Sequence, residues 1–352
     1  MYLLEDDLPF ISILLAVYNE EKVIQQKIES TLQTSYPPEK IEWLIGLDKC
    51  SDRTAMILRQ YENHLKHLKL IHFEERMGKI AIINQLAEEA KGEIFIFTDA
   101  NVFFTRETLY NLVKHYKEQH IALVAGNILN PTIKSDGISR QESSYQILEN
   151  RLKYNEGILW GAMMGAFGGC YSMRKRFFLP TPVNFLVDDF YITMGVIEQG
   201  GKAINELDAI CYEDVSNKIT EEFRRKTRIA AGNFQNFARF IRLLSPYKGG
   251  VAFAFWSHKV LRWLGPLLLI LCYLSSFVLS SDHQFYRGCF WIQTFLFMLP
   301  VLDLVLRKLK IHFFGLRYIS HFYLMNLALL TGFFKYLIGV KDNVWEPTER
   351  NQ

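Results

Sequence analysis

Short apolar runs alternate with amphipathic stretches through the first 130 residues of the chain. Five of these runs are rich in branched or aromatic side chains, and most are nearly continuous: residues 11–17, 41–47, 68–73, 94–98 and 121–128. Continuous runs of this length are typical of strands that are buried on both faces of a parallel sheet. Between them, apolar residues recur at helical spacing, as in residues 20–34 and 79–90. The pattern predicts βαβ units and an α/β fold with a Rossmann-like, mostly parallel sheet.

The alternation weakens after residue 129. We expect a helix over residues 139–158, a glycine-rich segment over 161–169, and strands over 170–173 and 202–213. A long basic helix follows at residues 220–244, and its basic and apolar side chains both recur at helical spacing. Such a helix either lies at a membrane surface or closes over an anionic ligand.

Three apolar runs dominate the C-terminal part of the chain. Residues 260–281 and 288–306 reach the length of about 20 residues that a membrane helix needs. The third run, residues 319–338, contains His321 and Lys335, so it either spans the membrane or lies in the interface. The alternative for all three runs is a set of buried core helices.

Basic residues follow the second apolar run at Arg307, Lys308 and Lys310, and positive clusters stay on the cytoplasmic side of a membrane. We therefore expect a multi-pass protein of the inner (plasma) membrane. Residues 1–245 then form a cytoplasmic domain that ends in the basic helix. Residues 246–352 form a membrane region with two or three transmembrane helices.

Composition and short motifs narrow the range of partners. The formal net charge is only +3, so the overall charge gives no reason to expect a nucleic-acid partner. The five cysteines contain no Cys-x-x-Cys pair and indicate no disulfide framework. The first strand is followed by no Gly-x-Gly-x-x-Gly segment, and the chain has no Gly-Lys-Ser/Thr loop, which argues against a dinucleotide site and a P-loop.

Polar side chains gather where the predicted parallel strands end. They are Asp48 and Asp52 after the second strand, Arg76 and Lys79 after the third, and Asp99 and Asn101 after the fourth. The carboxyl ends of parallel strands share one edge of the sheet, where open α/β folds bind ligands. Cations there neutralise phosphate, while carboxylate and amide oxygens suit Mg²⁺ or Mn²⁺. The set therefore suits a nucleoside diphosphate, although Asp and Asn are also ordinary turn residues and the two cations could begin a solvated helix.

A second acidic pair, Asp188 and Asp189, precedes an expected helix that ends at Glu198. Two adjacent carboxylates in this position either cap the helix, because anions are favoured at a helix N-terminus, or supply a general base. A general base removes the proton from an attacking hydroxyl while a metal stabilises a departing diphosphate. Taken alone, the pair favours capping.

In combination these segments resemble the family-two glycosyltransferases with a GT-A fold. The segments that carry the resemblance are residues 13–20, 48–54, 76–79, 99–101 and 187–189, in the order of the family's motifs. Asp99-Ala100-Asn101 is similar to the Asp-x-Asp metal motif, with Asn101 in place of the second acid. Val187-Asp188-Asp189 is similar to the Thr-Glu-Asp motif of the membrane-bound polysaccharide-making members, in which the last Asp is the base.

Residues 225–229 stand where those members have Gln-x-x-Arg-Trp. Arg228 matches this motif, whereas Arg225 and Ile229 do not. The missing Trp at position 229 removes a stacking surface for a sugar, which argues against processive synthesis. Residues 256–259 and 345–348 also resemble bacterial membrane glycosyltransferases of exopolysaccharide pathways.

The resemblance implies an inverting, metal-dependent glycosyltransferase with a nucleotide-sugar donor, expected to be a UDP-sugar, and a lipid-linked or growing-glycan acceptor. It implies nucleotide contacts from Asp48, Asp52, Arg76, Lys79, Asp99 and Arg228, a metal site at Asp99 and Asn101, acceptor contacts from Asp188, Gly168 and Gly169, and Asp189 as the catalytic base. Two alternatives stay open. One is a processive polysaccharide synthase, and the other is a non-catalytic membrane subunit, which Asn101 and Ile229 would favour.

Overall fold

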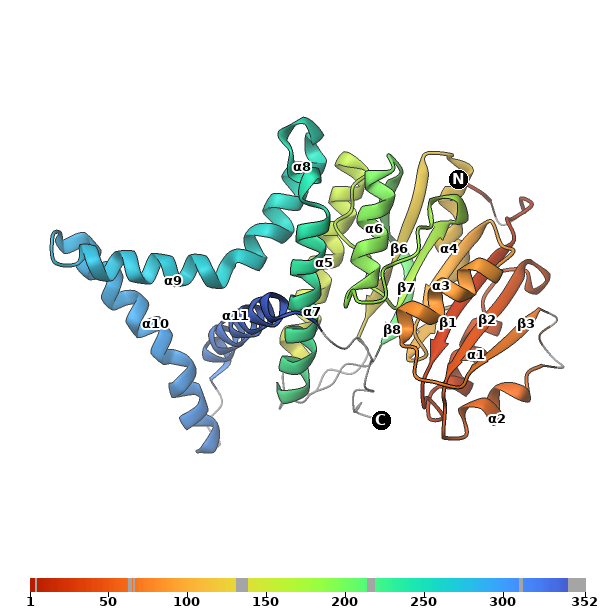
Figure 1. Ribbon diagram of the computed structural model, residues 1–352, viewed down its shortest axis with the longest axis horizontal. Helices are drawn as coiled ribbons and strands as arrows, with labels where there is room; N and C mark the ends of the chain where they lie inside the picture. The colour runs from red at the N-terminus through yellow and green to blue at the C-terminus, as the bar shows by residue number, and fades with distance from the viewer. Residues whose placement is uncertain are drawn as a thin grey trace.

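An eight-stranded sheet forms the centre of the protein in its computed structural model (Figure 1). The structure describes residues 1–3, 5–62, 65, 67–130, 139–213, 219–309 and 313–340, so the segment 345–348 lies outside the described residues. The strands are β1 (Ile11–Val17), β2 (Ile41–Asp48), β3 (Leu68–Phe73), β4 (Ile94–Thr98), β5 (Val102–Phe104), β6 (Ile121–Leu129), β7 (Cys170–Arg174) and β8 (Lys202–Glu213). The seven strands that the sequence predicts are confirmed, and β5 is an additional short strand.

The order of the strands in the sheet is β3-β2-β1-β4-β7-β6-β8-β5. β1 pairs in parallel with β2 and β4, and β2 pairs in parallel with β3. β7 is inserted antiparallel between β4 and β6, and β5 runs antiparallel to β8. The sheet is therefore parallel where the predicted nucleotide residues lie and mixed beyond β4, which the alternation of strands and helices does not predict.

The helices follow in chain order. They are α1 (Ile24–Leu32), α2 (Thr54–Arg59), α3 (Lys79–Glu89), α4 (Thr108–Val113), α5 (Ser139–Trp160), α6 (Asp188–Glu198), α7 (Ile219–Arg239), α8 (Gly250–Ala254), α9 (Leu261–Leu279), α10 (Gln284–Lys308) and α11 (Phe314–Ile338). α1 begins at Ile24 rather than at residue 20. The backbone of Asn19 is left-handed, with φ +51°, and its Oδ1 accepts a hydrogen bond from the Ser51 N–H at 2.9 Å.

Helices cover both faces of the sheet. Along β1, Leu14 belongs to one cluster of buried side chains, whereas Ile13 and Leu15 belong to the other. The first cluster includes side chains of α3 and α6, and the second includes side chains of α1 and α4. Burial from two sides explains why the strands appear in the sequence as continuous apolar runs.

The buried core continues from the sheet into the first C-terminal helix. Trp263 of α9 packs edge-on against Phe190 of α6, with ring centroids 5.4 Å apart, and both belong to the same buried cluster. A π-helical turn, Phe255–Val260, joins α8 to α9, so the three segments form one continuous helix. Residues on both sides of the predicted boundary at residue 245 therefore share one core.

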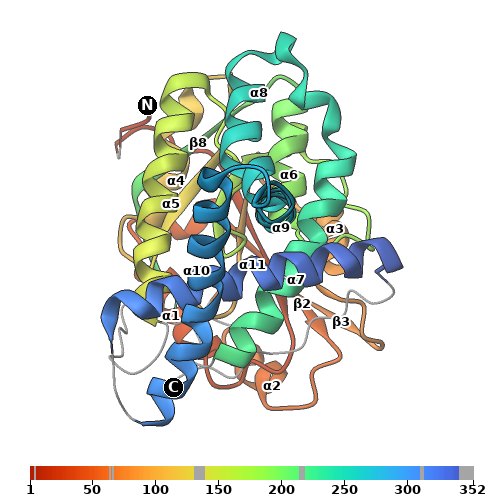
Figure 2. The ribbon, with the colours of Figure 1, turned by 90° about the vertical axis from the view of Figure 1, so that its left-hand side faces the viewer.

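α9 and α10 form a helical hairpin that projects away from the sheet (Figures 1 and 2). Of the residues that the structure describes, Gly250–Leu279 and Gln284–Leu306 form the two helices that are long and apolar enough to cross a membrane. Only 22% and 6% of their most apolar windows are buried within the protein. These two helices are therefore not the buried core helices of the alternative prediction, and their exposed apolar surface suits a lipid environment.

α11 crosses α7 instead of lying along the hairpin. α9 is seen lengthwise in Figure 1 and end-on in Figure 2, whereas α11 extends lengthwise across Figure 2. At the crossing, a Cβ on Gly332 would lie 2.8 Å from the carbonyl oxygen of Thr227 and 2.9 Å from the nitrogen of Ala231, so glycine is needed for this close approach. Of the two placements predicted for residues 319–338, the direction of α11 favours the membrane interface.

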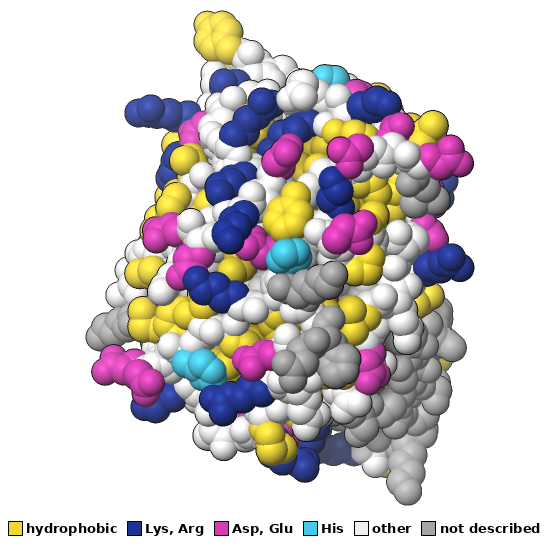
Figure 3. Space-filling view, turned by 90° about the vertical axis from the view of Figure 1, so that its right-hand side faces the viewer, with side chains coloured by type: hydrophobic (Ala, Val, Ile, Leu, Met, Phe, Trp, Pro, Cys, Tyr) yellow, Lys and Arg dark blue, Asp and Glu magenta, His cyan; other side chains and the backbone are white. Residues whose placement is uncertain are grey.

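The sheet ends at β3, which is an edge strand. Figure 3, which views this end of the molecule, shows Lys and Arg side chains interspersed with Asp and Glu. Lys69 of β3 forms an ion pair with Glu89 of α3. Mixed charges around an edge strand disfavour pairing with the edge of another sheet.

Candidate functional site

A cleft of about 800 Å³ lies at the carboxyl ends of the parallel strands and is bounded by α6 and α7. Nine predicted site residues line it: Asp48, Lys79, Asp99, Asn101, Gly168, Gly169, Asp188, Asp189 and Arg228. The other two, Arg76 and Asp52, lie beside the cleft in the loops that shape it. Arg225 and Lys226 of α7 also line it, so this face of the basic helix closes over the cleft.

Asp48, at the end of β2, is buried and holds the loop that precedes α3. Its Oδ1 accepts a hydrogen bond from the Met77 N–H at 2.7 Å, and its Oδ2 accepts from the Gly78 N–H at 3.2 Å. The Nε of Arg76 donates to the same Oδ2 at 3.1 Å, and its guanidinium lies 3.2 Å from the centre of the Tyr18 ring. Asp48 therefore fixes the positions of Arg76 and of the start of α3.

Asp52 joins the loops that follow β1 and β2. Its Oδ2 accepts from the Glu21 N–H at 3.1 Å, and its Oδ1 accepts from the Thr54 N–H at 3.0 Å. These bonds order the nucleotide side of the cleft without bringing Asp52 into its lining.

The Asp99-Ala100-Asn101 segment turns at the end of β4. Lys79 Nζ donates to Asp99 Oδ1 at 2.7 Å, and Asn101 Nδ2 donates to Glu213 Oε1 at 3.0 Å. Glu213, at the end of β8, lines the same cleft. Sequence reasoning missed it, although a carboxylate at the end of a predicted strand was the available signal. Glu213 is therefore a second acidic group, after Asp99, beside the position where Asn101 replaces an acid.

The donor set fits a hard divalent cation that is shared with a diphosphate. Asp99 and Asn101 supply carboxylate and amide oxygens, which Mg²⁺ and Mn²⁺ prefer. Within the described ranges, no group of three or more His, Cys, Asp or Glu side chains could hold a metal by itself. Gly169 adds no side chain here, and a Cβ on it would lie 3.7 Å from Asp99 Oδ2. Phosphate and water oxygens would complete the coordination of Mg²⁺ or Mn²⁺ at this place.

A buried lysine, Lys27 of α1, lies beneath this turn. Its Nζ donates to Thr98 Oγ1 at 2.7 Å and to the carbonyl oxygen of Val102 at 2.6 Å, one on each side of the Asp99–Asn101 segment. Burial lowers the pKa of Lys27 to about 7. Sequence reasoning missed this residue, although a lysine between Ile24 and Ile28 on the inward face of a helix was the signal. Lys27 positions the turn from below.

Asp189 lies in the first turn of α6. Its Oδ1 accepts from the N–H of Phe190 at 2.6 Å. Burial, followed by the negative charge of Asp188, raises the pKa of Asp189 to about 6. A Cβ on Gly168 would lie only 2.9 Å from Asp189 Oδ2, so glycine keeps the space next to this oxygen open. At neutral pH, Asp189 is ionised but basic enough to accept a proton.

Two cations face the acids of the cleft. Burial opposes the charge of Lys79, but Asp99, Asp188 and Asp189 raise its pKa above its ordinary value. Burial lowers the pKa of Arg228, although a guanidinium stays charged at neutral pH. Carboxylates and cations are thus close together in the cleft, which can bind a metal–diphosphate group while a carboxylate takes up a proton.

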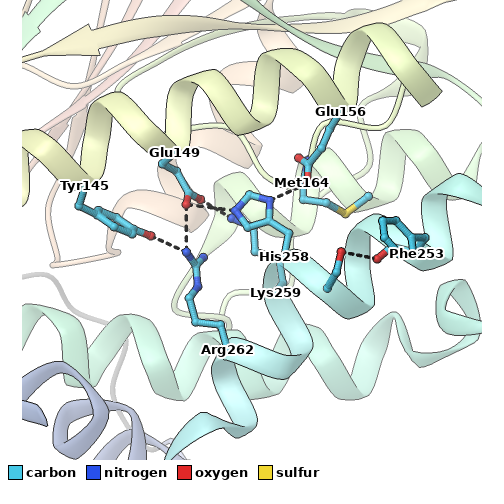
Figure 4. Close-up of polar contacts among 9 residues, drawn as sticks. Tyr145, Glu149, Glu156, Met164, Phe253, His258, Lys259 and Arg262 are labelled. Carbon is cyan, nitrogen blue, oxygen red and sulfur yellow. Dashed lines mark hydrogen bonds and ion pairs between the residues drawn. The ribbon is translucent and has the colours of Figure 1, made fainter. Parts of the chain in front are cut away.

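A buried ionic cluster joins α5 to the helix that runs into α9 (Figure 4). Arg262 Nη1 donates to Glu149 Oε2 at 3.0 Å and to the Tyr145 hydroxyl at 2.9 Å, and Lys259 Nζ donates to Glu149 Oε1. Burial opposes the charge of Glu149, but Lys259, His258 and Arg262 hold its pKa well below its usual range. Glu149 therefore anchors the first C-terminal helix to α5.

The same cluster continues to the wall of the cleft. His258 Nδ1 lies 2.6 Å from Glu156 Oε1, and Glu156 Oε2 accepts from the Met164 N–H at 3.0 Å. Met164 itself lines the cleft. The π-helical turn that carries His258 is thus connected to the glycine-rich segment beside Asp189.

Glu149→Gln is expected to lower the free energy of unfolding by about 3 kcal/mol, because it removes the ion-pair partner of the buried Lys259. The measurement is the unfolding of the detergent-solubilised chain by heat or denaturant. The matched control is Glu198→Gln, which breaks the half-exposed pair between Glu198 and Arg239 and should cost less than about 1 kcal/mol. Equal losses at the two positions would contradict an anchoring function of Glu149.

Comparisons with known proteins identify a domain and a fold. Residues 12–179 match the family model described as Glycosyl transferase family 2. A poly-beta-1,6-N-acetyl-D-glucosamine synthase of Staphylococcus epidermidis is 23% identical over 283 residues, which are 77% of this chain and 66% of that protein. A dolichyl N-acetyl-alpha-D-glucosaminyl phosphate 3-beta-D-2,3-diacetamido-2,3-dideoxy-beta-D-glucuronosyltransferase of Methanococcus voltae is 29% identical over 207 residues, which are 55% of this chain and 63% of that protein. The chain thus spans less than two thirds of the length of either relative.

A solved structure is similar over most of the chain. It is the mannosyltransferase PcManGT from Pyrobaculum calidifontis in complex with GDP-Man and Mn²⁺, with a TM-score of 0.70 at 20% sequence identity. The similarity covers 94% of this chain and 87% of that one. It shows that the two proteins share the GT-A fold, as the sequence predicts.

Proposed function

We propose that the chain is an inverting, metal-dependent glycosyltransferase with a UDP-sugar donor, and the match of residues 12–179 to the model of glycosyl transferase family 2 supports this proposal. The observation that carries the proposal is one cleft that joins the acid–amide pair Asp99 and Asn101, the cations Lys79 and Arg228, and the proton-accepting Asp189. These are the groups that displacement of a diphosphate by a hydroxyl needs.

The nucleotide binds at the carboxyl ends of β1, β2 and β3, beside Asp48. Asp48 and Arg76 contact the nucleoside, and Asp52 keeps their loop in place. Lys79 and Arg228 contact the diphosphate, and Asp99 and Asn101 would hold Mg²⁺ or Mn²⁺ beside it. When bound, that cation neutralises charge that develops on the leaving diphosphate.

The acceptor enters from the side of Gly168, Gly169 and Asp188. Asp189 takes the proton of the acceptor hydroxyl, and the oxygen attacks the anomeric carbon. The bond between that carbon and the diphosphate oxygen breaks on the opposite face, so the configuration inverts and UDP leaves. Lys79 and Arg228 stabilise the negative charge that collects on the UDP.

The exposed apolar surface of the hairpin supports a placement in the membrane. We assign residues 1–245 to the cytoplasmic catalytic domain and α9 with α10 to the plasma membrane, with α11 in the interface. The acceptor is then a lipid-linked or glycan molecule that reaches the cleft from the membrane side. Processive polysaccharide synthesis is the second candidate, which the similarity to the Staphylococcus epidermidis synthase supports.

Binding of nucleotides to the purified chain tests the proposal before any acceptor is known. We expect UDP to bind in the presence of Mn²⁺, more weakly with EDTA, and more tightly than GDP or ADP. Calorimetric titration of all three nucleotides supplies the comparison. Preference for GDP would refute the use of a UDP-sugar, and the absence of binding by every nucleotide would refute the proposed activity.

A further inference from the structure

Lys153 of α5 is a buried cation in the wall of the cleft. Its side chain is 2% exposed, and its Nζ lies 3.4 Å from the centre of the Phe167 ring. Among the residues with described placement, no hydrogen bond or ion pair to this nitrogen is found, and its closest recorded contact is the aromatic ring. Burial, followed by repulsion from Lys259, lowers the pKa of Lys153 to about 7. A buried amine without a hydrogen-bond acceptor or counter-charge is unfavourable for folding. A bound ligand could supply that acceptor to Lys153.

The position of Lys153 points to the acceptor rather than the donor. The carboxylates that raise its pKa are Glu149, Asp189 and Glu156, whereas those that raise the pKa of Lys79 are Asp99, Asp188 and Asp189. Asp189 is common to both sets. The Phe167 ring that Lys153 contacts directly precedes Gly168 and Gly169, which line the cleft on the proposed acceptor side.

Apolar side chains of the C-terminal helices also line the cleft. Trp263 of α9 and Met325 and Leu329 of α11 belong to its lining. The nearby cations Lys259 and Arg262 are already paired with Glu149. The site thus combines one unpaired cation with an apolar wall, next to helices that are suited to a membrane.

We propose that Lys153 binds a phosphate group of the acceptor, and that this acceptor is a phosphorylated lipid whose apolar chain lies against Trp263 and α11. The proposal rests on the proposed function, because it uses Asp189 to define the acceptor side. In many amphipathic molecules, a phosphate ester links an apolar chain to a sugar or is itself the polar head group. Binding pairs the buried amine and favours its protonated form.

The test compares farnesyl phosphate with farnesol, in a non-ionic detergent at pH 6.5. The wild-type chain should bind the phosphate at least about tenfold more tightly, which is the usual size of a charge-assisted hydrogen bond. Lys153→Met should lose most of this preference and Lys153→Arg should keep part of it. Affinity for farnesyl phosphate should fall as the pH rises through 7, because the ammonium form binds.

Three results would overturn the inference. One is an unchanged preference for the phosphate in Lys153→Met. Another is loss of UDP binding in this variant, which would place Lys153 on the donor side. The third is glucose 1-phosphate binding as tightly as farnesyl phosphate, which would assign the site to a soluble phosphate.

Two further measurements separate this inference from its rivals. Lys153→Met keeps the length of the side chain and removes a buried charge, so the Tm of this variant should equal or exceed that of the wild type. A lower Tm together with loss of all binding would show that Lys153 has only a structural function. A wild-type chain that binds farnesyl phosphate through Lys153 but binds no nucleotide would refute the proposed function and leave the phosphate site standing.

Discussion

Asp189→Asn is expected to reduce sugar transfer by a factor of about 10² to 10⁴, the usual contribution of a general base. The amide keeps an oxygen that can accept from the Phe190 N–H, so the local structure should persist. UDP and Mn²⁺ should bind as they do to the wild type, because Asp189 lies on the acceptor side of the reacting carbon. The measurement is the rate of UDP release, together with a calorimetric titration of UDP. Wild-type rates in this variant would refute the assignment of the base.

The dependence on pH gives a second readout of the same carboxylate. Because the pKa of Asp189 is raised to about 6, the wild-type kcat/KM should fall as the pH decreases through 6, where the carboxylate becomes protonated and can no longer accept a proton. The matched control is Asp188→Asn, which makes the same chemical change one residue earlier. Since the charge of Asp188 raises the pKa of Asp189, this variant should shift the acidic limb to lower pH. An unshifted limb would mean that another group limits the rate.

Asp99→Ala is expected to abolish the metal-dependent part of nucleotide binding. Loss of an outer-shell partner typically weakens a metal site by roughly 10- to 100-fold, and a direct ligand should matter more. The variant also removes the ion-pair partner of Lys79. The measurement is the affinity for UDP at increasing Mn²⁺ concentrations.

Asp208→Ala is the matched control for Asp99→Ala. Asp208 is an exposed carboxylate on β8 outside the cleft lining, so its removal should leave the dependence on Mn²⁺ as in the wild type. Equal affinity of the Asp99→Ala variant and the wild type at every Mn²⁺ concentration would eliminate Asp99 as a metal ligand.

Asn101 is the feature that most favours a non-catalytic subunit, and the structure weakens that argument. Its amide donates to Glu213, which comes from a strand more than a hundred residues later in the chain, and Glu213 lines the cleft. A carboxyl side chain is therefore present beside the position where the motif lacks an acid. The number of acidic residues in the short motif is therefore smaller than the number in the site, because Glu213 comes from outside the motif.

The parts of the fold that the sequence predicts are those with a local cause. β1, β2 and β4 are largely apolar runs because helices bury them from both sides, and Asp48, Lys79 and Asp99 meet because parallel strands end at one edge. β5 has three residues and is too short to produce a pattern. The antiparallel insertion of β7 between β4 and β6 depends on pairing across the sheet, which no local pattern contains.

The parts of the site that the sequence does not predict depend on long-range packing. Lys27, Lys153 and Glu213 each lie within an ordinary helix or strand, and their importance comes from what the fold places next to them. The sequence allows the long basic helix to lie at a membrane surface or to close over an anionic ligand. In the structure, α7 packs against α11, and its Arg225 and Arg228 line the cleft. Asp189 could have been a helix cap, but burial beside Asp188 gives it a pKa that suits a base.

Metal-dependent turnover of a nucleotide sugar in this cleft is the activity that we propose. Its most direct test is the release of UDP by the detergent-solubilised chain over a panel of UDP-sugars, with Mn²⁺ and with EDTA, beside the Asp99→Ala variant as the blank. Slow transfer to water allows this measurement without the natural acceptor. We predict release from one donor, dependent on Mn²⁺ and absent in the variant. Release that is the same with EDTA or in Asp99→Ala would contradict the account.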